Sequence, residues 1–206
     1  SIGQHFASTL DLIAVGSSAL AHFTRGVRTW ITLAFVLALH FSQAQSAERH
    51  VDQARVWSTI ERLSEFGRPA GAGFEGGVTR IGFSETDLAA RAWLAQLMRE
   101  AGLVVRVDQA GNLFGRRAGS DNLPILLFGS HIDSVVGGGN FDGDVGSLGA
   151  LEVMRALDDA KLTTRHPLEM VVWANEEGNH FGHGLLGSTA AAGLLAPEVL
   201  ERKDQD

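Results

Sequence analysis

The chain has 206 residues, a formal net charge of -7 and a hydrophobic fraction of 45%. This length and composition are typical of a globular protein with one well-formed core. The acidic balance argues against nucleic-acid binding, because phosphate contacts need a basic face and the 17 Lys and Arg residues form no extended run. The chain has no cysteine, so any bound metal must be held by His, Asp or Glu.

The N-terminal part, residues 1–46, has the pattern of a leader that contains a secretory signal peptide. Residues 30–39 form an apolar run, which follows Arg25 and Arg28 and precedes the small-x-small sequence of residues 42–44. The run has about ten residues, whereas a membrane-spanning helix needs roughly 20, so a stable membrane span is disfavoured. We expect a periplasmic or secreted protein. A buried helix in a cytoplasmic protein is the alternative.

Two helices are expected in the first part of the sequence that follows the leader. Residues 51–66 carry apolar side chains at the spacing of an amphipathic helix. Residues 71–83 are rich in glycine and are expected to form a loop. A second helix is expected over residues 84–101, with Ser84 as its N-cap and Gly102 as its stop signal.

The second part of the sequence alternates strands and a helix. Residues 103–107 and 113–116 are expected to form short strands joined by a turn. Residues 123–128 and 168–174 are nearly continuous apolar runs, and for the first of these we expect a strand buried on both faces.

A helix over residues 148–157, capped by Ser147, separates these two apolar runs. A strand, a helix and a second strand in this order predict a parallel pair with a right-handed crossover. The expected fold class is therefore α/β, with a mixed, largely parallel sheet flanked by helices.

Acidic residues and one histidine follow the two apolar strands. His131, Asp133 and Asp142 come after the first strand, and Glu176 and Glu177 come after the second. In open parallel sheets, ligands bind at the carboxyl ends of the strands. A His-x-Asp pair alone is a weak signal, but this combination surrounded by glycine is hard to explain as solvated surface. It predicts a site for divalent metal ions.

The five residues have different expected roles. His131 would bind one ion through a ring nitrogen, while Asp133 would accept the other ring N–H and hold the imidazole in the ligating tautomer. Asp142 could bridge two cations roughly 3.5–4 Å apart, as in two-metal hydrolases. Glu177 is the expected ligand, and Glu176 is the expected general base that takes a proton from water and passes it to the leaving nitrogen.

These motifs resemble the hydantoinase/carbamoylase family of amidases. The resemblance rests on GSHIDSV at residues 129–135, GGNFDG at residues 138–143 and EEGNHFGHGLLGS at residues 176–188. GGVTR at residues 76–80 and DQAGNLFG at residues 108–115 are similar to its upstream signatures. The combination is specific, and it covers the chain from about residue 51 onward.

The resemblance implies a zinc-exopeptidase-like catalytic domain and an N-carbamoyl-L-amino-acid hydrolase, allantoate amidohydrolase or ureidopropionase-type activity. It implies two divalent metal ions, Zn or else Mn, Co or Ni, a small carbamoyl or ureido substrate, and a homodimer. The family positions of the first-metal His, the bridging Asp, the base and the second-metal Glu fall on His131, Asp142, Glu176 and Glu177. A metallo-exopeptidase or aminoacylase of the same clan is the alternative.

The sequence also departs from the family pattern. Asn175 stands where an Asp often precedes the Glu pair, and Asp144 stands where a small or apolar residue is usual. Neither change removes a ligand. His180 and His183 could contact metal or substrate, or could be polar loop residues, and Ser188 is a further candidate for substrate contact.

Members of the family are considerably longer than residues 47–206, which we expect to form the N-terminal portion of the catalytic domain. Their remaining part contains two further metal-ligating histidines, an inserted dimerisation domain, and Arg and Asn residues that bind the substrate carboxylate. A non-catalytic fragment is therefore the third interpretation of this chain, because missing ligands weaken metal binding.

Overall fold

The computed structural model describes residues 51–203, so the predicted leader and its apolar run lie outside the described residues. Within this part of the chain, no helix has both the length and the apolar character needed to cross a membrane. The elements, in chain order, are α2 Gln53–Leu63, a 3-10 helix Phe74–Gly76, α3 Glu85–Glu100, β1 Val104–Val107, β2 Leu113–Arg117, β3 Leu126–His131, α4 Asp144–Asp159, β4 Leu168–Trp173, α5 Leu186–Ala191 and a 3-10 helix Pro197–Glu201.

The strands form one mixed sheet in the order β1-β2-β4-β3. β3 and β4 pair in parallel, as predicted, and the α/β class is confirmed. The expectation of a largely parallel sheet is wrong for the described residues, because β2 runs antiparallel to both β1 and β4. The short turn between β1 and β2 leaves no room for the crossover that a parallel pair needs.

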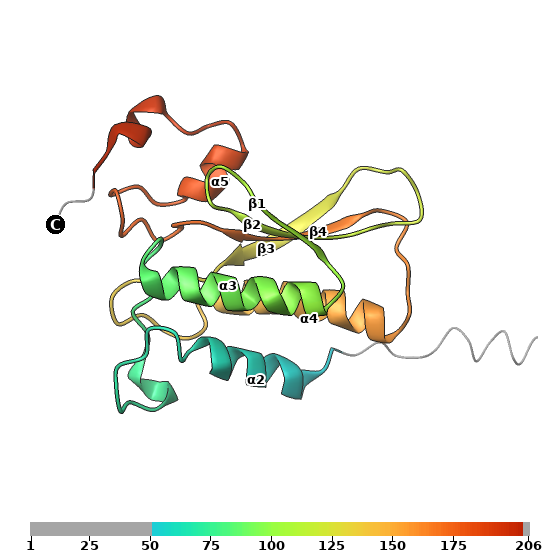
Figure 1. The fold of residues 1–206 in the computed structure, drawn as a ribbon, viewed down its shortest axis with the longest axis horizontal. Coiled ribbons are helices and arrows are strands. Elements are labelled where there is room, and N and C mark those ends of the chain that lie inside the picture. Colours follow the sequence, from blue (N-terminus) through green and yellow to red (C-terminus); the bar gives the residue numbers. More distant parts are fainter. Residues whose placement is uncertain (1–50, 204–206) are drawn as a thin grey trace, which may run out of the picture. The chain divides into compact units, whose positions relative to one another are not determined.

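Three helices, α2, α3 and α4, lie on one face of the sheet, and α5 lies on the other face (Figure 1). α3 packs on β1 and β2, α4 packs on β3 and β4, and α2 packs on α4. Together they enclose one apolar core, whose buried members are Ile60, Leu63, Ala90, Leu94, Ala95, Met98, Leu103, Leu113, Ile132, Leu148, Ala150, Leu151, Met154, Leu168, Met170 and Val172.

The helix starts differ in how well the sequence predicted them. Ser84 caps α3 as expected, because its side chain accepts a hydrogen bond from the amide of Asp87. The predicted cap of α4 at Ser147 is wrong, since this helix already begins at Asp144. Gly143, with a φ of 68°, turns the chain into the helix earlier. Ser147 therefore lies inside α4, where its hydroxyl donates to the main-chain oxygen of His131 at 2.9 Å.

β3 corrects the expectation of a strand buried on both faces over residues 123–128. The strand starts later, at Leu126, and it occupies one edge of the sheet. Leu126 and Leu127 are 50% and 48% exposed, because no strand among residues 51–203 pairs with the outer edge of β3. β4, which lies between β2 and β3, is buried along almost its whole length, as expected.

Candidate metal centre

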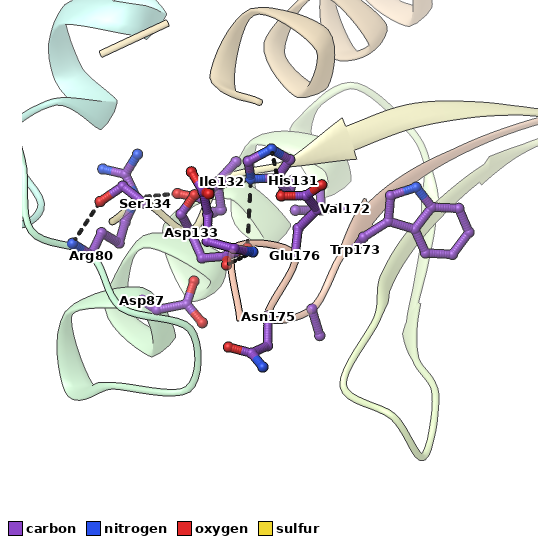
Figure 2. Close-up of polar contacts among 12 residues, drawn as sticks. Arg80, Asp87, His131, Ile132, Asp133, Ser134, Val172, Trp173, Asn175 and Glu176 are labelled. Atoms are coloured by element: carbon purple, nitrogen blue, oxygen red, sulfur yellow. Dashed lines mark hydrogen bonds and ion pairs between the residues drawn. The ribbon is translucent and has the colours of Figure 1, made fainter. Parts of the chain in front are cut away.

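His131 is the last residue of β3, and its buried side chain reaches past the end of the strand toward Glu176 (Figure 2). Its Nδ1 atom lies 3.0 Å from the main-chain oxygen of Asp133. Its Nε2 atom lies 3.5 Å from the Oε2 atom of Glu176. If Nδ1 carries the proton and donates to the Asp133 carbonyl, the lone pair of Nε2 faces the carboxylate and is free to bind a cation.

Glu176 and Glu177 follow the end of β4 and complete a group of three side chains that could hold a metal ion. One ligand atom from each of His131, Glu176 and Glu177 lies within 4.8 Å of the other two. An imidazole with carboxylates suits zinc and other first-row divalent metals. The structure thus brings together His131 at the end of β3 and the two glutamates that follow β4.

Asp142 is not a member of this group of three, but its turn packs directly on the imidazole. A Cβ atom built on Gly143 would lie 2.5 Å from both Cε1 and Nε2 of His131. Burial is the main cause that raises the pKa of Glu177, and the negative charge of Asp142 raises it further. The bridging role of Asp142 stays a prediction.

Asp133 connects the ends of the two parallel strands. Its Oδ2 atom accepts a hydrogen bond from the main-chain amide of Glu177 at 3.0 Å. Its Oδ1 atom lies 3.7 Å from Nδ1 of His131 and has no hydrogen-bond partner among residues 51–203. The sequence predicts that the Asp133 carboxylate accepts the ring N–H of His131. In the structure, the main-chain carbonyl oxygen of Asp133 lies closer to Nδ1 than its carboxylate does. Its catalytic role stays a prediction.

Two buried polar residues that the sequence analysis did not single out hold the chain just before the Glu pair. The side chain of Asn112 accepts a hydrogen bond from the amide of Ala174 at 3.0 Å and donates one to the oxygen of Gly187 at 2.9 Å. Arg91 donates to the main-chain oxygen of Trp173 at 3.2 Å. Asn112 lies within one of the recognised motifs, but nothing in the sequence shows that it reaches α5 and the end of β4.

The loop after the Glu pair is folded by Asn175, a buried residue with a φ of 48°. Its side-chain nitrogen donates to the main-chain oxygens of His180 and His183 at 3.1 and 3.3 Å. The Nε2 atom of His183 is buried and has no hydrogen-bond partner in the described part of the chain. The hydroxyl of Ser188 donates to the oxygen of Leu185 at the start of α5. Substrate contact by His183 or Ser188 stays a prediction.

The site concentrates negative charge. Burial raises the pKa of Glu177, and His131 counteracts this rise. Asp142, Glu176 and Asp133 raise the pKa further, because each adds negative charge nearby. A divalent cation removes this mutual repulsion, so the carboxylate cluster favours cation binding.

Comparisons with known proteins agree with this geometry. A model of Peptidase family M28 matches residues 112–203. An N-carbamoyl-L-amino acid amidohydrolase from Geobacillus stearothermophilus is 42% identical over 153 residues, which make up 74% of this chain and 36% of that protein. A ureidoglycolate hydrolase from Arabidopsis thaliana is 38% identical over 144 residues, or 69% of this chain and 29% of that protein.

The fold also matches a solved structure. The crystal structure of an amidase of the hydantoinase/carbamoylase family from Burkholderia vietnamiensis superposes with a TM-score of 0.72 and 39% identity, covering 77% of this chain and 38% of that one. The relatives are hydrolases, and the match to family M28 implies dependence on a metal. Within that class, this chain belongs to the hydantoinase/carbamoylase amidase family. It spans a little more than a third of the length of these bacterial relatives.

The packing of Gly143 on the imidazole leads to a test of the site. In the intact protein, Gly143→Ala should displace the His131 ring and weaken metal binding about 10-fold or more, because the new methyl group occupies the space of the ring. Gly137→Ala is the matched control, since Gly137 has a similar φ of 64° and nothing lies within 4 Å of a Cβ atom at that position. Zinc titration of both variants measures the difference, and equal affinities would contradict the assigned packing.

Proposed function

We propose that this chain carries part of the metal centre of an amidohydrolase that cleaves linear C–N bonds in N-carbamoyl or ureido substrates. The proposed substrates are N-carbamoyl-L-amino acids or allantoate. The observation that supports it most is the convergence of His131, Glu176 and Glu177 at the ends of two parallel strands. The 42% identity to an N-carbamoyl-L-amino acid amidohydrolase supports the choice of substrate class.

The proposed cofactor is a pair of divalent ions, zinc or else manganese, cobalt or nickel. When bound, such ions act as Lewis acids that polarise the scissile carbonyl group. His131 and Glu177 would bind the ions, and the two oxygens of Asp142 would be shared between them. All three residues offer the nitrogen and oxygen donors that these metals accept.

Glu176 is the proposed general base. Its carboxylate takes a proton from water, the water oxygen forms a bond to the carbonyl carbon, and the C–N bond then breaks as the same proton passes to the leaving nitrogen. Glu176 lies beside His131 and is only partly buried, so water can reach it. The neighbouring Glu177 carboxylate, once it ligates a metal, no longer repels the charge on Glu176.

A metallo-exopeptidase or aminoacylase is the second candidate, and the match to Peptidase family M28 favours it. The two candidates differ in their substrates. We expect the intact protein, supplied in turn with Zn, Mn, Co and Ni, to release ammonia from N-carbamoyl-L-amino acids or allantoate and to leave dipeptides intact. Cleavage of dipeptides alone would assign the second candidate. A metal-loaded protein that hydrolyses none of these compounds would support a non-catalytic role.

The division of labour between base and ligands can be tested by substitution. In the intact protein, Glu176→Gln should lower turnover about 10²–10⁴-fold while metal content stays close to that of the parent, because the amide cannot accept the proton. Asp142→Ala should lose both metals. Turnover assays and elemental analysis measure the two effects, and equal metal loss in both variants would refute the assignment.

We also propose that the protein is exported, on the basis of the apolar run at residues 30–39 and the small residues that follow it. Removal of the leader should give a mature N-terminus near Gln45. N-terminal sequencing of the protein from its native host would measure this, and a product that keeps residues 1–44 in the cytoplasm would contradict export. For the whole protein we propose a homodimer, as the family resemblance implies.

A further inference from the structure

A buried arginine lies next to the candidate metal centre and takes no part in the proposed chemistry. The side chain of Arg80 is entirely buried, and its guanidinium donates to the main-chain oxygens of Leu63, Phe66 and Ile132. Its Nη2 atom donates to both carboxylate oxygens of Asp144 at 2.9 and 2.8 Å. All three nitrogens of the guanidinium therefore donate hydrogen bonds, which fixes its position in three dimensions.

Two of the partners of Arg80 belong to the segments that carry the predicted ligands. Ile132 directly follows His131, and Asp144 lies two residues after Asp142. The main chain of Arg80 adds a second connection, since its amide and its carbonyl oxygen each bond to Ser134 at 2.9 Å (Figure 2). One side chain thus joins the end of β3 to the start of α4.

Stability alone does not explain this arrangement. Burying a guanidinium and a carboxylate costs desolvation energy, and an apolar pair of similar volume often stabilises a fold as well or better. An apolar pair cannot form directional hydrogen bonds. The planar fork of Arg80 fixes both the Ile132 carbonyl and the Asp144 carboxylate, and through them the main chain on either side of the His131 ring.

We propose that Arg80 and Asp144 are positioning residues, which hold the His131 end of β3 and the Asp142–Gly143 turn at the spacing that the metal ions require. The proposal rests on the proposed function only in assuming that these segments bind metal. The packing of Gly143 on the imidazole makes the spacing sensitive, because a small shift of the turn moves the ring as well. Neither residue touches substrate.

The test compares two double variants of the intact protein. Arg80→Met with Asp144→Leu removes both charges at similar volume. It also leaves the main-chain oxygens of Leu63, Phe66 and Ile132 without the donor that Arg80 supplied, so we expect a folded protein with reduced stability. The matched control is Arg55→Met with Glu152→Leu, which removes another ion pair joined by two hydrogen bonds. In that pair, Arg55 of α2 donates to both carboxylate oxygens of the buried Glu152 of α4, each at 2.8 Å.

Three measurements are made on each protein: the thermal midpoint of the metal-free form, zinc affinity by competition titration, and the absorption spectrum of the cobalt-loaded form. We expect the Arg80/Asp144 variant to stay folded with a lower thermal midpoint, to lose about 10–100-fold in zinc affinity and to show an altered cobalt spectrum. The control should keep the parental affinity and spectrum. If the Arg80/Asp144 variant fails to fold, Asp144→Asn, which keeps the size of the side chain, should show the same loss in milder form.

The outcomes separate the two proposals. Parental zinc affinity and cobalt spectrum in a folded Arg80/Asp144 variant, or in Asp144→Asn, would overturn the positioning role and leave the proposed function intact. A parent protein that binds metal and shows the expected loss in the variant, yet hydrolyses none of the tested substrates, would support positioning and contradict the function. A parent that binds no metal would refute both.

Discussion

The parallel pairing of β3 with β4 is the constraint on which the candidate site depends. Its register places His131 opposite Trp173, so the chain beyond β4 needs only three further residues to bring Glu176 beside the imidazole. The C-terminal ends of two parallel strands lie at the same end of the sheet, and α4 provides the crossover that makes this pairing possible. If β3 and β4 ran antiparallel, His131 and the Glu pair would lie at opposite ends of the sheet.

Hydrogen bonds of buried polar side chains fix the positions of the segments that follow β3 and β4. Asp133 ties the end of β3 to the amide of Glu177, Asn112 ties the end of β4 to α5, and Arg80 ties β3 to α4. Each of these connecting hydrogen bonds lies inside the protein, where a hydrogen bond is electrostatically stronger than in water. The ligand-bearing segments are therefore fixed by a polar frame beneath them as well as by the apolar core.

The structure and the comparisons give different parts of the functional argument. The geometry of His131, Glu176 and Glu177 supports a metal centre, and the relatives include an N-carbamoyl-L-amino acid amidohydrolase and a ureidoglycolate hydrolase. The chain spans a little more than a third of the bacterial relatives that were compared. This explains why the site is better defined in its metal-binding side chains than in its substrate contacts.

The sequence by itself determined the class of fold, the cap of α3, the parallel pair and the segments that carry the acidic residues, because these follow from local periodicity, local hydrogen bonds and strand order. It failed on the start of α4, where the packing of Gly143 against His131 overrides the capping preference of Ser147, and on β3, whose exposure depends on its place at the sheet edge. Only the tertiary structure decided that Arg80 and Asp144 meet, since 64 residues separate them and no local pattern records a contact across that distance.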